Sequence, residues 1–151
     1  MGSLVRLETL LVGLQERVRQ NFHIRSSHRV GTHPVNLAFR FLLELSALAI
    51  MGFWGWRQRD DGARIVIALA VPLLAAALWG IFAVPGDPSR SGAAPVPVPG
   101  IVRLVLECGF FGFGTWALAD VGFSRLAAIF GTSTVLHYLL SYDRIAWLIR
   151  Q

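Results

Sequence analysis

The chain has 151 residues, of which 54% are hydrophobic and only 15% carry a charge. Ordinary soluble domains have roughly 25% charged residues, so this sequence has too few polar groups to cover a surface exposed to water. The composition therefore excludes a typical soluble globule and predicts an integral membrane protein. All 14 basic residues are arginine and the net charge is +5. In a chain this apolar, that excess suits anionic lipid headgroups and not nucleic acid.

The first 33 residues differ in character from the rest of the chain. Hydrophobic side chains recur there at steps of three and four with polar side chains between them, as in an amphipathic helix. They are Leu4, Leu7, Leu11, Leu14 and Val18. We expect residues 1–33 to form an amphipathic N-terminal arm whose helix lies at the membrane interface against anionic headgroups. Packing of the same face on a partner or on the bundle is an equally good alternative.

Four apolar stretches follow, and each is close to the roughly 20 residues that cross a bilayer core. The predicted spans are residues 35–56, 65–84, 101–121 and 126–142. The proline-rich segment between 85 and 99 predicts an extended linker. The short turn between the last two spans makes them antiparallel neighbours. We therefore expect residues 34–151 to form one all-α domain, an integral membrane four-helix bundle.

The placement of arginine predicts the orientation, because cytoplasmic flanks of spans are enriched in positive charge. With the N-terminus inside, the cytoplasmic side holds Arg17, Arg19, Arg25, Arg29, Arg90, Arg103, Arg144 and Arg150. The opposite side holds only Arg57, Arg59, Arg64 and Arg125. The sequence therefore predicts a multi-pass protein of the cell membrane with both termini in the cytoplasm.

Charged residues inside the predicted spans are informative, because a charge within a bilayer is energetically unfavourable. Arg40 and Glu44 in the first span, and Arg103 and Glu107 in the third, are each four residues apart on one helix face. An offset of 63 superposes RFLLE on RLVLE, which indicates a weak internal repeat. Arginine before acid is the less favourable order within a helix. We therefore expect crossed pairs between the helices, Arg40 with Glu107 and Arg103 with Glu44.

Two interpretations of this charge network remain open. As structural pairs, the charges fix helix packing and register; as a functional site, Glu44 is a proton-coupled or substrate-binding carboxylate. The structural interpretation is favoured, because a carboxylate beside arginine stays ionised and is a poor proton carrier. Asn36 lies one turn before Arg40 and is expected to hydrogen-bond the network. His137 in the fourth span predicts an interhelical hydrogen bond, with a proton relay as the alternative.

Motifs for catalysis or metal binding are missing from the sequence. It has no G-x-S-x-G, no phosphate loop, no H-E-x-x-H and no cysteine pair. His23, His28 and His33 are five residues apart, which fits neither one helix face nor zinc-ligand spacing. We therefore expect no enzymatic activity, no metal, no cofactor and no binding of nucleic acid.

The same residues resemble, in order, the YrdB family of small bacterial membrane proteins. The resemblance is carried by residues 36–45 (NLAFRFLLEL), 54–56 (WGW), 72–82 (PLLAAALWGIF), 103–107 (RLVLE) and 113–114 (FG). It covers about residues 35–142 and implies a four-helix protein of the bacterial inner membrane, in a family with no established activity. Two features depart from the family pattern. They are the arm up to His33, and Ser133-Thr134, where an asparagine and an arginine are expected in the last helix.

Three classes of function follow. A structural or accessory membrane subunit is favoured, because the charges balance internally and the arm offers a surface for a partner. That partner is a second copy or another membrane protein. An oligomeric small-solute transporter that uses an intramembrane carboxylate is the alternative, and it requires at least a dimer because four spans do not easily enclose a solute path. A membrane-embedded enzyme is least favoured, because no nucleophile and base lie at useful spacing.

Overall fold

The computed structural model describes residues 33–87 and 93–151, so the predicted N-terminal arm up to Thr32 lies outside the described residues. The described part contains five helices and two short strands. In chain order they are α2 (Pro34–Arg57), α3 (Ala63–Ile81), β1 (Phe82–Ala83), β2 (Val96–Pro97), α4 (Gly100–Asp120), α5 (Ser124–Leu140) and α6 (Tyr142–Ile149). The largely helical structure predicted from the sequence is confirmed.

Among the described residues, three helices are long and apolar enough to cross a membrane: α2 with 24 residues, α3 with 19 and α4 with 21. They begin and end within a few residues of the first three predicted spans. α5 has 17 residues, or about 26 Å at 1.5 Å per residue, slightly less than a bilayer core of roughly 30 Å. The predicted fourth span to Tyr142 is wrong at its end, because the chain turns at Ser141 and α6 begins there.

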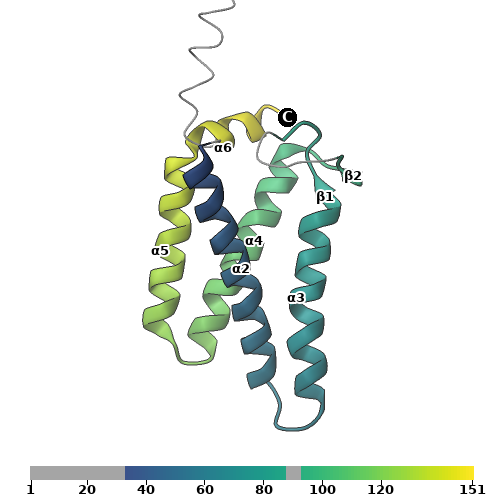
Figure 1. Ribbon diagram of the computed structural model, residues 1–151, viewed down its shortest axis with the longest axis vertical. Helices are drawn as coiled ribbons and strands as arrows, with labels where there is room; N and C mark the ends of the chain where they lie inside the picture. Colours follow the sequence, from purple (N-terminus) through teal and green to yellow (C-terminus); the bar gives the residue numbers. More distant parts are fainter. Residues whose placement is uncertain (1–32, 88–92) are drawn as a thin grey trace, which may run out of the picture. The chain divides into compact units, whose positions relative to one another are not determined.

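Local sequence explains where the helices begin and turn. Pro34 occupies the first turn of α2, and the His33 imidazole accepts a hydrogen bond from the Val35 amide at 3.3 Å. At the start of α3, the Asp61 carboxylate accepts from the Ala63 amide at 3.1 Å. Gly122, between α4 and α5, has a φ of +90° that a residue with a side chain rarely adopts. These signals set two helical hairpins, α2–α3 and α4–α5 (Figure 1).

The segment after α3 is extended, and the expected helix to Val84 is wrong because the helix ends at Ile81. Pro85 disfavours a helical conformation at the residue before it. β1 instead pairs in parallel with β2, with Phe82 opposite Val96. Among residues 93–99, the described end of the proline-rich segment, strand β2 thus lies beside β1.

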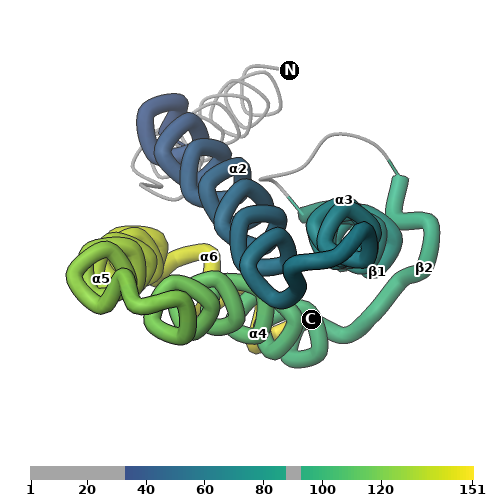
Figure 2. The backbone as a smooth tube through the Cα atoms, turned by 90° about the horizontal axis from the view of Figure 1, so that it is seen from below, coloured from purple at the N-terminus to yellow at the C-terminus, as the bar shows by residue number. Residues whose placement is uncertain are grey.

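Helix α2 is the centre of the bundle and packs against α3, α4 and α5, whereas α3 meets α4 only marginally (Figure 2). The core consists of Leu43, Ala47 and Met51 of α2, Phe110, Phe111 and Leu118 of α4, and Ala127 and Phe130 of α5. α3 contributes no buried residue. It is held through α2, where a Cβ on Gly55 would lie 2.8 Å from the Ile67 carbonyl. The two backbones therefore touch at this point.

Helix α6 lies across the end of the bundle at which α2 and α4 begin (Figure 1). It buries Arg144 and Leu148, which are one turn apart on the same face. Gly100 at the start of α4 lets α6 approach, because a Cβ there would overlap the Leu148 carbonyl. α6 therefore brings Arg144 to the interior of the bundle.

Candidate functional site

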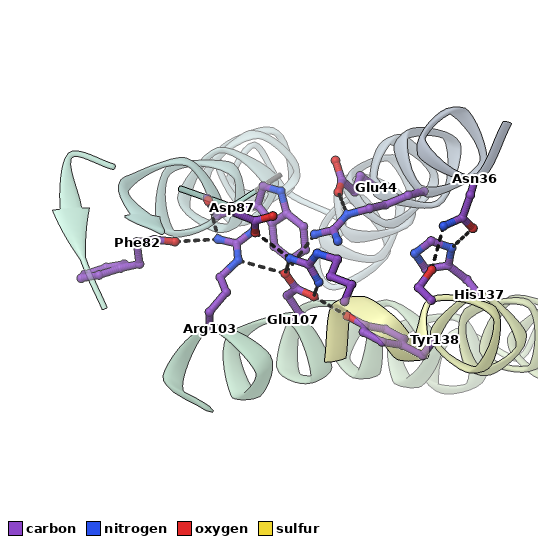
Figure 3. Close-up of polar contacts among 12 residues, drawn as sticks. Asn36, Glu44, Phe82, Asp87, Arg103, Glu107, His137 and Tyr138 are labelled. Atoms are coloured by element: carbon purple, nitrogen blue, oxygen red, sulfur yellow. Dashed lines mark hydrogen bonds and ion pairs between the residues drawn. The ribbon is translucent and has the colours of Figure 1, made fainter. Parts of the chain in front are cut away.

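Glu107 of α4 is completely buried and is the centre of the polar interior. Its carboxylate accepts hydrogen bonds from Arg40 Nη2 at 2.9 Å, Arg103 Nε at 3.0 Å and Tyr138 Oη at 2.9 Å. Arg144 donates to both carboxylate oxygens, at 2.8 and 2.7 Å. Figure 3 shows Glu107 between Arg103 and Tyr138. These donors belong to α2, α4, α5 and α6, so one carboxylate joins four helices.

Two further carboxylates balance the arginines. Arg40 Nε donates to Glu44 Oε1 at 2.8 Å, and Arg144 Nη2 donates to Asp87 Oδ2 at 2.9 Å. We call Arg40, Glu44, Asp87, Arg103, Glu107 and Arg144 the charge cluster. It contains three guanidinium groups and three carboxylates and is neutral overall. Such balance matters because an unpaired charge in a low-dielectric interior is strongly unfavourable.

Arg103 also ties the end of α3 to the cluster. Its Nη1 donates to the backbone carbonyls of Trp79 at 2.8 Å and Phe82 at 2.6 Å (Figure 3). These carbonyls lie at the C-terminal end of a helix, where backbone acceptors are left without partners in the helix itself. The guanidinium also stacks 4.1 Å from the centre of the Trp79 ring. Arg103 therefore stabilises the place at which the helix gives way to strand β1.

The predicted pairs form only in part. Arg40 contacts Glu107 across the helices as expected. The other crossed pair is wrong: within residues 33–87 and 93–151, Arg103 pairs with Glu107 and Glu44 pairs with Arg40. Both intrahelical pairs form although arginine comes first. The preference for acid before arginine is worth only a few tenths of a kcal/mol. It is outweighed at Glu107, because a buried carboxylate is strongly unfavourable unless it accepts hydrogen bonds from nearby donors.

Asn36 and His137 meet each other. The Asn36 side-chain oxygen lies 3.1 Å from His137 Nδ1, and Asn36 Nδ2 donates to Ser141 Oγ at 2.8 Å. His137 is 2% exposed, so this contact is inside the bundle. His137 thus makes the interhelical contact that the sequence indicates, and Asn36 reaches the end of α5 (Figure 3).

Sequence reasoning missed Arg144, Asp87 and Tyr138 as members of the site. The sequence places Arg144 among the cytoplasmic arginines and Asp87 in the predicted linker between 85 and 99. One signal pointed to a missing cation: Ser133-Thr134 stand where the family pattern has an arginine in the last helix. A second was the spacing of Arg144 and Leu148 on one face of a short amphipathic helix. In this chain the third guanidinium beside Glu107 comes from α6.

Two cavities adjoin the cluster. The polar cavity, about 210 Å³ in volume, is lined by Arg40, Glu44, Trp79, Gly80, Ala83, Asp87 and Arg103. The apolar cavity, about 380 Å³, lies among α2, α3 and α4, and Trp79 lines it too. Glu107 has no acceptor left for a ligand, since its two oxygens already accept five hydrogen bonds. In the described part of the chain, no three His, Cys, Asp or Glu side chains gather where they could hold a metal ion.

These features define a small helical protein whose described part has three helices long and apolar enough to cross a membrane, together with a neutral charge cluster centred on the buried Glu107. The chain belongs to the family described as protein of unknown function DUF2568, whose pattern matches residues 38–135. It is 37% identical over 119 residues to the uncharacterized protein YrdB of Bacillus subtilis (strain 168), covering 79% of this chain and 97% of that protein. The predicted membership of the YrdB family is thus confirmed. No solved structure matches the chain.

Proposed function

We propose that this chain is a four-helix protein of the bacterial inner membrane, with α2, α3, α4 and α5 crossing the bilayer. The outward faces of these helices support this arrangement, because large apolar side chains are exposed along them. They include Phe41 and Leu42 of α2, Leu73 and Leu74 of α3, Val105 of α4, and Ile129, Leu136 and Leu139 of α5. Exposed apolar patches of this extent are unfavourable in water and are typical of a surface in contact with lipid.

Both termini lie on the cytoplasmic side in this proposal, because more arginines flank the spans there. A Cys108→Ser background carrying Asp61→Cys or Gln151→Cys tests it. A membrane-impermeant maleimide added to intact cells should label the probe at 61, in the turn between α2 and α3, and miss the probe at 151. The opposite labelling pattern would overturn the orientation.

We further propose that the protein is a structural or accessory membrane subunit without enzymatic activity. The observation that carries this proposal is the saturation of Glu107 by three guanidinium groups and one phenol. A carboxylate that carries a proton or solute must exchange partners during each cycle. Glu107 is held by four helices at once, so exchanging its partners would break up the bundle. The cluster therefore holds the helices in one packing arrangement.

The experiment is purification of the full-length chain from its native membrane in mild detergent. An accessory subunit should retain one membrane protein at constant stoichiometry, and purification of that protein should retain this chain in return. Leu7→Glu with Leu11→Glu changes the apolar side of the arm and should release the partner. Gln20→Glu, opposite these leucines in the predicted helical pattern, is the matched control and should not. A chain that purifies without a partner in every case would contradict the accessory role.

A second candidate, an oligomeric small-solute transporter, is favoured by one observation at Glu44. This carboxylate lines the polar cavity, and its side chain is 21% exposed. A solute-dependent flux in proteoliposomes that Glu44→Gln abolishes, while the bundle loses no more than about 1 kcal/mol of its free energy of unfolding, would select the transporter. Equal flux with and without the protein would exclude it.

A further inference from the structure

The gap between α3 and α4 holds both cavities and opens toward the outside of the bundle. α3 packs on α2 but meets α4 only marginally, which leaves the gap unfilled by side chains. Trp79 forms a wall common to the polar and the apolar cavity. It lies two residues before the end of α3, close to where a membrane helix reaches the headgroup level. The polar cavity therefore lies near the headgroups, and the apolar cavity extends from it along the spans.

The polar cavity offers hydrogen-bonding groups of both charges. Within the described residues, Arg40 Nη1, Arg103 Nη2 and Glu44 Oε2 take part in none of the contacts that hold the charge cluster together. In the same part of the chain no fully buried side-chain nitrogen or oxygen lacks a partner, so these three atoms are not fully buried, and the residues that carry them line the polar cavity. The lining holds two guanidinium groups and two carboxylates, because Asp87 lines the cavity as well and pairs with Arg144. Together these groups complement a ligand that carries both a negative and a positive charge.

The apolar cavity matches the depth of one leaflet. It is lined on α3 from Val71 to Trp79 and on α4 from Val105 to Phe113. Eight residue steps of helix span about 12 Å, close to half of a bilayer core that is roughly 30 Å thick. Gly109 lies in the wall, and nothing comes within 4 Å of the place where its Cβ would be. The cavity is thus long and apolar, and Leu78 and Val105 in its wall are exposed on the outside of the bundle.

We propose that the gap between α3 and α4 binds one phospholipid with a zwitterionic aminoalkyl phosphate headgroup. The phosphate contacts Arg40 and Arg103, the ammonium group contacts Glu44, and one acyl chain fills the apolar cavity. A soluble polar ligand would use only the polar cavity, and a second copy of the chain would supply no polar group at this depth from an apolar helix face. Only an amphiphile uses both cavities across their common wall. This inference does not depend on the accessory role proposed above.

Native mass spectrometry of the full-length protein tests the proposal. The protein is reconstituted with equal amounts of phosphatidylethanolamine and phosphatidylglycerol and then released from detergent. We expect one phosphatidylethanolamine per chain, retained about tenfold more than phosphatidylglycerol, which corresponds to the loss of one charge-assisted contact. Equal retention of both lipids would overturn the headgroup assignment. Lipid-free dimers would show that a second copy occupies the gap.

Two glycine variants show whether the lipid binds in the gap or elsewhere on the protein surface. Gly109→Leu places a side chain in the apolar cavity and should abolish lipid retention. Gly112→Leu is the matched control on the same helix: its Cβ also meets nothing within 4 Å, and it does not line the cavity. Glu44→Gln should keep a bound lipid but lose the preference for the ethanolamine headgroup. Equal lipid retention by the two leucine variants would overturn the proposed site.

Discussion

At the end of the bundle covered by α6, three arginines surround a Glu107 that is 0% exposed. At the opposite end, in the turn between α2 and α3, Arg59 and Asp61 pair at 3.2 Å with side chains 59% and 58% exposed. Both ends thus hold arginine–carboxylate pairs with similar distances. They differ in whether water reaches the charges, and this difference decides what each pair contributes to stability.

An exposed pair changes little when it is broken, because water solvates each charge in turn and such pairs contribute about 0–1 kcal/mol. A buried pair differs because removing one partner leaves the other charge without solvation. Glu107 shares its charge among three arginines. The stability of the bundle should therefore depend on the α6 end far more than on the opposite end.

The largest expected effect is that of Glu107→Gln. Gln keeps the size of the side chain but removes the charge, which leaves Arg40, Arg103 and Arg144 in excess over the remaining carboxylates. We expect the free energy of unfolding in detergent to fall by about 4 kcal/mol. Glu44→Gln is the same change at a partly exposed carboxylate with one arginine partner, and it should lower this free energy by only about 1 kcal/mol. Equal losses would remove the distinction between buried and exposed members of the cluster.

Arg144→Leu should rank second. It keeps an apolar side chain on this face of α6 but removes the guanidinium, which leaves Asp87 without this partner and Glu107 with one guanidinium fewer. We expect a loss of about 3 kcal/mol, together with faster proteolysis after α6 is released from the bundle. Arg150→Leu makes the same substitution at the exposed residue that follows α6 and should leave both measurements unchanged. A matching effect at Arg150 would show that only the net charge of α6 matters.

Gly100→Ala tests the contact between α4 and α6 without changing a charge. The added Cβ would overlap the Leu148 carbonyl, so α6 must shift and the arginine on it must move with it. We expect a loss of about 2 kcal/mol, as for overpacking at a close contact. Gly112→Ala has open space around the new Cβ and should leave the melting temperature unchanged or raise it. If Gly100→Ala behaves like this control, the close approach does not hold α6 in place.

Arg59→Gln should have the smallest effect. The pair with Asp61 is exposed on both sides, and we expect a change below about 0.5 kcal/mol that high salt removes entirely. A melting curve at low and at high salt measures it. A loss comparable to that of Glu44→Gln would show that the two ends of the bundle are less different than their exposure indicates.

The sequence predicted the part of the site whose members lie in apolar runs. Arg40, Glu44, Arg103 and Glu107 stand out there, because a charge among twenty apolar residues is unusual wherever the helix lies. Asp87 and Arg144 follow spans, where charged residues are ordinary, so neither attracts attention. Their burial results from the fold: α6 turns back at Ser141 and carries Arg144 inward.

The fold was predictable to a similar degree. Hydrophobic length set α2, α3 and α4 to within a few residues, because these helices depend on local composition. The partners within the cluster depend on distances across the bundle, which spacing along one helix does not determine. Intrahelical order therefore suggested Glu44 as the partner of Arg103, whereas the structure gives that role to Glu107.

The order in which the ribosome makes the cluster has a consequence for assembly of the bundle. Arg40 and Glu44 leave the ribosome first, Asp87 follows, then Arg103 with Glu107, and Arg144 is the last to be made. Until α6 has been synthesised, Asp87 and Glu107 lack the arginine that the finished bundle gives them. The helices can therefore reach their final packing only after translation has passed residue 144. Before that point the bundle is incomplete, and this incomplete form is the one that chaperones and proteases encounter.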